Sequence, residues 1–354
     1  MSIRAAGRSA VVLAAAAAAL LPLPASWIER WYSNGIYPRV QTRMTTAVNA
    51  VGVALFDVLI AVVAVVAIVS VVRRVRRRRQ TGFLRTAATA LRDLVVLAAC
   101  VYLAFLFAWG LNYRRVPLER KVDYAESRVT PDAARDLARA SVQRLNQLHG
   151  AAHGDAPAKR TLEQAFVAAQ QRLGASRFAT PGVPKRSVLE LYFRRAAIDG
   201  MTDPFFLEVI LNPDVLPFER PFVLAHEWGH LAGYADESEA SLLAWLTCLE
   251  GDERAQYSGW LAIYSHVIGN LPRPDARAIA EPLQSGPRAD LAAINARLAR
   301  SSPMVRTVAR DAYDAYLKAN RVEEGIASYD AVVRLILGAG QDNGWAPRAV
   351  SADR

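Results

Sequence analysis

Cysteine is scarce in this chain of 354 residues, which has only Cys100 and Cys248. Two cysteines exclude a disulfide scaffold and a cysteine-rich metal site. Net charge is also missing from most of the chain, because residues 113–354 hold 30 Lys and Arg residues and 30 Asp and Glu residues. Domains that bind nucleic acid need a basic surface, so we expect no nucleic acid among the partners of this segment.

Long apolar runs are concentrated in residues 1–112, and hydrophobic residues make up 53% of the whole chain. A helix needs roughly 20 apolar residues to cross the hydrocarbon core of a bilayer. Segments 51–72 and 94–111 approach that length, and segment 10–27 is shorter and rich in alanine. The basic start of segment 10–27 also fits a signal peptide, but Ala25 ends a poor cleavage site. We therefore predict a membrane region with three transmembrane helices in contact with lipid.

The arginines between the second and third apolar segments predict the orientation of the chain. The linking stretch 73–92 contains eight arginines, against three between the first two segments. The positive-inside rule places such an Arg-rich loop in the cytoplasm. We therefore expect a multi-pass membrane protein in which residues 113–354 form an extracytoplasmic domain. Asp57, near the start of the second segment, is expected to reach the membrane interface.

Helix signals dominate residues 113–354, and from Pro221 onward almost the whole sequence reads as helical. Two short apolar runs, 188–193 and 206–211, are strand candidates. The domain is therefore predicted to be an α-rich α+β fold with a small sheet.

Residues 226–230 read His-Glu-Trp-Gly-His, which is an HExxH motif. Residues four apart lie on one face of a helix, so His226 and His230 can present two imidazoles to one Zn²⁺. Glu227 is then placed beside the metal, where it can take a proton from an attacking water. The motif predicts a zinc site with Glu227 as the catalytic base.

A catalytic zinc normally has a third protein ligand, and three acidic residues follow the motif. Asp236 and Glu239 fit a capping box at the start of the next helix, so Glu237 is the carboxylate least needed for capping. Glu237 followed four residues later by Ser241 also resembles the second motif of zincins whose third ligand is glutamate. We predict Glu237 as the third ligand, with Glu239 and Asp236 as alternatives.

Other polar residues have less specific roles. A tyrosine or histidine often stabilises the developing oxyanion in such enzymes. Tyr329 is predicted for this role, in competition with Tyr313, Tyr316 and His266.

The strand candidate 206–211 lies just before the motif and is interpreted as an edge strand that pairs with substrate, or else as a core strand. Glu208 on this strand is expected to face either the cleft or solvent. His149 and His153 are interpreted as surface residues.

The chain resembles the bacterial family called domain of unknown function 3810. Four segments carry the resemblance: WIERWYSNGIYP from Trp27, WGLNYRRVPL from Trp109, HEWGHLAGYADESEASLLAWL from His226, and YLKANRVEEGIASYD from Tyr316. The resemblance implies a membrane-anchored HExxH protein of the bacterial inner membrane that looks like a zinc metallopeptidase with a zincin-like fold. Ser241 stands where asparagine would be expected.

Together, the motif and the apolar segments predict a membrane-anchored zinc metallopeptidase that hydrolyses peptide bonds in cell-envelope peptides or proteins. The alternative is a non-catalytic membrane-anchored binding or scaffold protein with a structural or vestigial metal site.

Overall fold

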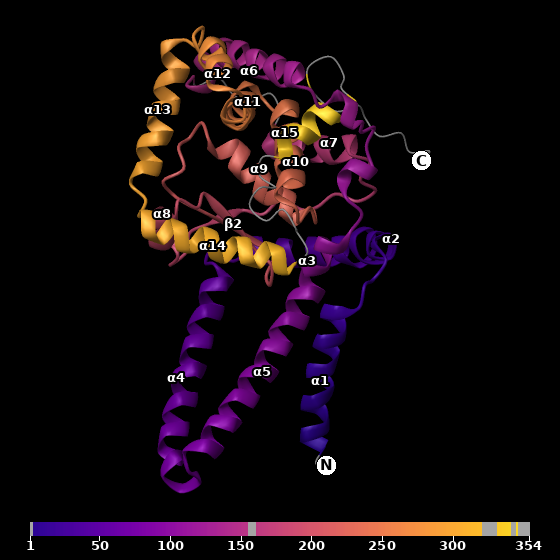
Figure 1. The fold of residues 1–354 in the computed structure, drawn as a ribbon, viewed down its shortest axis with the longest axis vertical. Helices are drawn as coiled ribbons and strands as arrows, with labels where there is room; N and C mark the ends of the chain where they lie inside the picture. Colours follow the sequence, from indigo (N-terminus) through magenta and orange to yellow (C-terminus); the bar gives the residue numbers. More distant parts are fainter. Residues whose placement is uncertain (1–2, 155–160, 321–330, 341–344, 346–354) are drawn as a thin grey trace.

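The computed structural model describes residues 3–154, 161–320, 331–340 and 345. Long helices extend from one side of a rounded helical domain, and a layer of shorter helices lies between the two parts (Figure 1).

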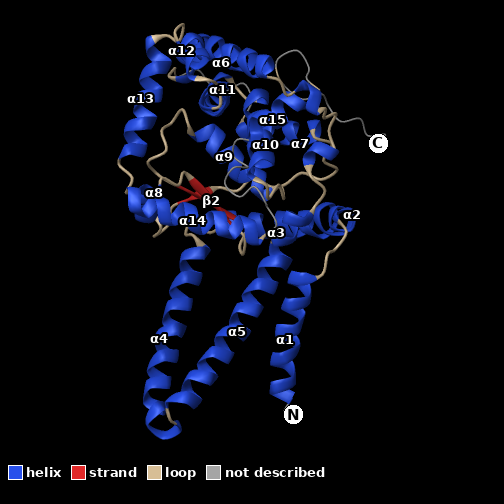
Figure 2. Cartoon of the chain, viewed as in Figure 1, coloured by secondary structure: helices blue, strands red, loops and turns tan. Residues whose placement is uncertain are grey.

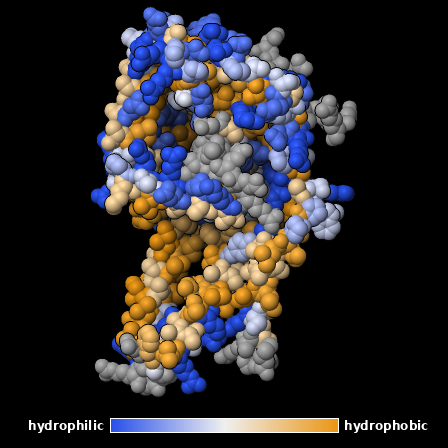
Figure 3. Space-filling model, viewed as in Figure 1, coloured by the Kyte–Doolittle hydropathy of each residue, from blue (hydrophilic) through white to orange (hydrophobic). Residues whose placement is uncertain are grey.

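Three long helices make up the extended part: α1 (Ile3–Leu20), α4 (Leu55–Thr81) and α5 (Phe83–Ala108). Helices α4 and α5 each contain a stretch long and apolar enough to cross a membrane. Helix α1 reaches this length only together with segment Ala25–Asn49, from which it is bent by 111°. Two spans are therefore supported, or three if the bent pair crosses as one. Figure 3 shows apolar side chains gathered on these helices, whereas the domain surface is largely hydrophilic.

The Arg-rich stretch 73–92 is not an extended loop, which corrects the expectation from sequence. Helix α4 continues to Thr81, and α5 begins at Phe83. The chain reverses at Gly82, which has φ +79°, a backbone conformation that side chains disfavour. Arginine is a good helix former, so the apolar helices simply continue past the bilayer-length segment.

A short layer joins the long helices to the domain: α2 (Ala25–Trp27), the π-helical η1 (Ile28–Ile36), α3 (Tyr37–Asn49) and η2 (Gly110–Arg114). Its aromatic side chains enter the domain core, where the hydroxyl of Tyr37 donates to the carbonyl of Leu231 at 2.9 Å.

Asp57 fixes the start of α4 to the domain, since its carboxylate accepts from Ser187 Oγ at 2.6 Å and from Val188 N at 2.9 Å. The long helices are therefore braced directly against the domain.

The domain is built around α10 (Glu237–Glu250), in which residues 237–248 are all buried. A helix that is apolar on every side must be covered on every side. The covering helices are α7 (Leu162–Arg172), α9 (Arg220–Leu231), α11 (Glu253–Gly269) and α15 (Ala331–Gly338), and α6 (Pro131–Ala152) packs on the outer side of α11. Trp245 of α10 and Trp260 of α11 pack edge to face with ring centroids 4.6 Å apart.

The remaining elements pack around this core. Helix α13 (Ser285–Ala299) runs down the side of the domain and leads into α14 (Pro303–Ala319), which crosses its base near α8 (Glu190–Ala196) (Figure 1). The smaller elements are η3 (Leu118–Arg120), η4 (Glu126–Arg128) and α12 (Arg273–Ala280).

Figure 2 shows how small the sheet is within the helical domain. Its strands β1 (Pro184–Lys185), β2 (Gly200–Asp203) and β3 (Glu208–Leu211) have the order β1-β3-β2. Strand β1 runs parallel to β3, and β2 runs antiparallel to it. The prediction of a mostly helical domain with a small sheet is therefore confirmed.

One of the two strand predictions is wrong. The run 188–193 is not a strand, because α8 begins at Glu190 and carries Arg194 and Arg195 in its last turn, charges that suit the helix dipole. The run 206–211 does contain a strand, β3, and its central, buried position confirms the core-strand alternative and not the edge-strand one.

Glu208 faces neither a cleft nor solvent, which corrects the expectation that it would do one or the other. It is 1% exposed and pairs with Lys185 Nζ at 2.9 Å. Its carboxylate also accepts from Leu55 N at 3.1 Å and Phe56 N at 2.8 Å. Glu208 therefore satisfies free backbone donors at the start of the long apolar helix α4.

Candidate metal centre

The HExxH motif lies on α9, whose start is favoured by a proline in the first turn. The helix ends before Gly233, which has φ +82° and allows the reversal into α10. His226 and His230 lie one turn apart on the same face, and their ring centroids are 4.8 Å apart. The sequence spacing thus places both imidazoles on one side of the helix.

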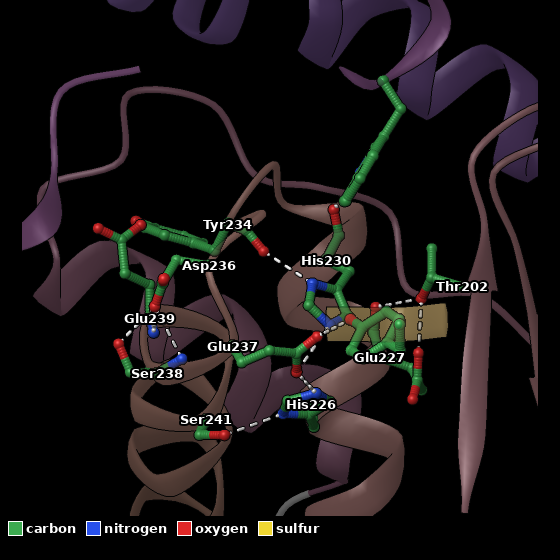
Figure 4. A network of polar contacts seen from close by, with 12 residues as sticks. Thr202, His226, Glu227, His230, Tyr234, Asp236, Glu237, Ser238, Glu239 and Ser241 are labelled. Atoms are coloured by element: carbon green, nitrogen blue, oxygen red, sulfur yellow. Dashed lines mark hydrogen bonds and ion pairs between the residues drawn. The ribbon is translucent and has the colours of Figure 1, made fainter. Parts of the chain in front are cut away.

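Glu237, at the first turn of α10, faces the two imidazoles (Figure 4). Its Oε2 atom lies 3.1 Å from His226 Nε2 and 3.6 Å from His230 Nε2. The ligand atoms of these three residues all lie within 4.8 Å of one another. Two helices therefore bring two ring nitrogens and a carboxylate oxygen to one point.

The other two acidic candidates are used elsewhere. Asp236 caps α10 by accepting from Ser238 N at 2.8 Å and Glu239 N at 3.3 Å. Glu239 does not complete a capping box, because its carboxylate accepts from Leu118 N. Burial raises the pKa of Glu239 despite the nearby charge of Lys121. Of the three carboxylates, only Glu237 points toward the histidines.

The second nitrogen of each imidazole is also held. His226 Nδ1 lies 3.1 Å from Ser241 Oγ, and His230 Nδ1 lies 2.8 Å from the carbonyl oxygen of Tyr234. A carbonyl can only accept, so His230 Nδ1 carries the hydrogen and its neutral ring has a lone pair at Nε2. Partners of this kind orient histidine ligands in metal sites.

The facing lone pairs require a cation between them. A neutral Nε2 and a carboxylate oxygen repel each other unless a proton or a metal ion lies between them. Burial by itself would lower the pKa of His230, but the Glu237 carboxylate outweighs it and raises this pKa to about 9. Burial opposes ionisation of Glu237, yet the charge of His230 holds the pKa of this carboxyl well below its ordinary value.

Glu227 lies on α9 beside strand β2. Its Oε2 accepts from Thr202 Oγ1 at 2.9 Å, and the same hydroxyl lies 2.9 Å from the Glu227 carbonyl oxygen. A Cβ atom on Gly200 would lie 2.7 Å from Glu227 Oε1, so glycine at this position leaves room for the carboxylate. Burial raises the pKa of Glu227, although the neighbouring histidines lower it.

The tyrosine candidates have different positions. Tyr329 lies outside the described residues. The Tyr313 hydroxyl on α14 donates to Glu237 Oε1, and its ring stacks on Tyr316 with centroids 5.9 Å apart. His266 lies in the last turn of α11. Of the candidates that the structure describes, Tyr313 directly contacts a predicted metal ligand.

Several contacts of the site are not visible in the sequence pattern. Trp109, at the end of α5, donates through Nε1 to the carbonyl oxygen of His230 at 2.9 Å, and its ring packs edge to face on that imidazole. Thr202 lies on β2, 25 residues before Glu227, whereas Tyr313, already among the tyrosine candidates, lies on α14, 76 residues after Glu237. These residues are far from the motif in the sequence, and no local pattern around them predicts that they contact it.

The comparison with known families supports the resemblance seen in the sequence. A family model described as Protein of unknown function (DUF3810) matches residues 32–337. The chain belongs to this family. No curated protein and no solved structure matches it.

The DUF3810 match includes the long helices α4 and α5 as well as α9, α10 and α14. The match therefore covers the two long helices α4 and α5 together with the candidate metal centre, whereas α1 lies before it.

Proposed function

We propose that the protein is a membrane-anchored zinc metallopeptidase, with His226, His230 and Glu237 as metal ligands and Glu227 as the catalytic base. The observation that carries this proposal is the convergence of two imidazole nitrogens and one carboxylate oxygen within 4.8 Å. Two nitrogen ligands and one carboxylate, with a fourth position for water, are typical of catalytic zinc.

The residues at the site fit a bound metal ion. Glu237 Oε2 is buried and has no hydrogen-bond partner of ordinary geometry among the described residues. Both imidazoles direct Nε2 toward this oxygen, and their Nδ1 atoms are occupied by Ser241 and Tyr234. A buried, charged carboxylate oxygen without a hydrogen bond is costly, and a cation held between it and the two imidazoles would offset this cost.

In the proposed mechanism, the metal ion would activate a water molecule and Glu227 would transfer its proton. Zinc would lower the pKa of a bound water toward about 7. Glu227 would take a proton from the attacking water and pass it to the leaving nitrogen. The raised pKa of Glu227 suits this role, because a carboxylate of ordinary acidity is a weak base at neutral pH. Thr202 would hold the Glu227 carboxylate in position.

We infer that β2, and not β3, is the strand that pairs with an extended peptide substrate. Strand β2 lies at one edge of the sheet, packs against α9, and carries Thr202 in contact with Glu227. A peptide added to a sheet edge gains backbone hydrogen bonds that do not depend on its sequence. The scissile bond would then lie beside the catalytic base.

The membrane arrangement supports a substrate in the cell envelope. The Arg-rich stretch 73–92, which forms the end of α4 and the start of α5, would lie on the cytoplasmic side of the bacterial inner membrane according to the positive-inside rule. The domain lies at the other end of these helices and would be extracytoplasmic (Figure 1).

The test uses the full chain purified in detergent. Glu227→Gln should bind as much zinc as the wild-type chain, and should lose about 10²- to 10⁴-fold in turnover on a peptide library. Glu253→Gln, a substitution at an exposed glutamate on α11, is the matched control. Equal activity of the two variants would remove Glu227 as the base. Zinc binding without turnover in the wild-type chain would favour the scaffold alternative.

A further inference from the structure

A second histidine pair lies far from the HExxH motif in sequence. His149 and His153, one turn apart at the end of α6, both direct Nε2 toward Asp290 of α13. The distances to Asp290 Oδ2 are 3.5 Å from His149 and 2.9 Å from His153. We propose that these three side chains form a second binding site for a divalent transition metal such as Zn²⁺.

The geometry matches that of the first centre. The two rings have centroids 4.6 Å apart, and the three ligand atoms lie within 4.8 Å of one another. The interpretation of both histidines as surface residues fits His153, whereas the His149 side chain is half-buried. The His153 side chain is 42% exposed, so water can complete the coordination of an ion held from the protein side.

Asp290 is the buried part of the site, at 6% exposure. Its Oδ2 accepts from the hydroxyl of Tyr257, a buried residue on α11, at 2.5 Å. Within the described part of the chain, its ion-pair partners are the two histidines. A buried carboxylate with no Lys or Arg partner needs positive charge nearby, and the hydroxyl that orients it is the kind of second contact that metal ligands have.

Close packing brings α13 against the first histidine. A Cβ atom on Gly286 would lie 2.4 Å from Cε1 of His149 and 2.7 Å from its Nε2. Glycine at this position therefore allows the imidazole to lie directly on the first turn of α13, next to Asp290.

The donor atoms indicate which metals would bind. Two imidazoles and one carboxylate suit Zn²⁺ and neighbouring transition metals, whereas Mg²⁺ and Ca²⁺ prefer oxygen ligands.

The sequence between the histidines indicates a structural role. His149 is followed by Gly150, whereas His226 is followed by Glu227, the proposed base. The residue next to the first histidine of the second site therefore cannot act as a base.

A metal here would fasten α13 to α6. The other end of α13 is already held, because Arg297 pairs with Asp199 at 2.6 Å and with Glu219 at 2.7 Å. Helix α13 leads into α14, which carries Tyr313 to the first centre. The second site would therefore stabilise the side of the domain that supports α14.

The test separates the two centres by substitution in the full chain. A His226→Ala/His230→Ala variant, stripped with chelator and titrated with Zn²⁺, should still bind one equivalent. Adding His153→Gln, at an exposed position, should abolish this binding, whereas Gln147→Ala on the same helix should leave it unchanged. Zinc should also raise the unfolding temperature of the first variant. The proposal would be overturned if the His226→Ala/His230→Ala chain bound no zinc, or if it still bound zinc after His153→Gln was added.

Two further variants test whether a loss of zinc binding could be caused by a loss of folding. Gly286→Ala keeps every ligand and improves helix propensity, but displaces the His149 ring. Tyr257→Phe keeps the ligands and removes the hydroxyl that orients Asp290. Each should weaken zinc binding about 10-fold or more with the metal-free fold intact. Unchanged affinity in both would contradict a metal held at this point, and neither result depends on peptidase activity.

Discussion

Metal-free protein should lose stability as the pH rises, because His230 of the first centre holds a proton next to the Glu237 carboxylate. The folded pKa of His230 is about 9, against an ordinary value of 6.5. A group whose pKa is raised by folding stabilises the protein fully below the unfolded value, and this stability is lost as pH rises through the folded value. Metal-free protein should therefore lose stability between about pH 6.5 and pH 9.

The magnitude follows from the same shift. One pKa unit corresponds to about 1.4 kcal/mol, so the proton on His230 contributes on the order of 3 kcal/mol. This is the same ion pair that depresses the pKa of Glu237, so the two effects are counted once. For a domain of this size, such a loss lowers the unfolding temperature by roughly 6–12 °C.

The assay is thermal unfolding of the chelator-treated full chain in detergent, measured from pH 6 to about pH 9.5. His230→Gln should remove the decline, because no proton is then bound at this position. Zinc should also remove it, because the ion takes the place of the proton between Nε2 and the carboxylate. A metal-free protein whose stability is constant or rises over this range would refute the reasoning about the facing lone pairs.

Two further substitutions test the surroundings of the site. Gly200→Ala should displace the Glu227 carboxylate, because the new Cβ would lie 2.7 Å from Oε1; turnover should fall at unchanged zinc content, and equal turnover would contradict the assigned position of the base. Glu208→Gln should destabilise the chain by about 3–5 kcal/mol, because Lys185 is left buried without its partner. Exposed Glu163→Gln should change stability by less than about 0.5 kcal/mol, and similar midpoints for the two variants would contradict a structural role for Glu208.

The parts of the site that sequence predicted are those set by local helix geometry. His226 and His230 share a face because four residues make about one turn. Asp236 takes the cap of α10 because its short side chain suits that position, which leaves Glu237 directed toward the imidazoles.

The parts that sequence did not predict depend on tertiary contacts. Thr202 and Trp109 reach the centre from distant segments, and nothing in their local sequence marks them. Tyr313 was one of several candidates, and only its tertiary contact with Glu237 distinguishes it from the others. The short apolar runs were ambiguous for the same reason: 188–193 contributes to a helix, whereas the central position of β3 is set by strands on both sides.

The most direct test of the central claim is the zinc content and X-ray absorption spectrum of the full chain carrying His153→Gln, so that only the first centre is observed. We predict one zinc per chain, with nitrogen and oxygen ligands at about 2.0–2.2 Å. Glu237→Gln should lose most of this zinc, whereas Glu239→Gln should keep it. A chain without bound zinc, or zinc that is unaffected by Glu237→Gln, would contradict the proposed centre.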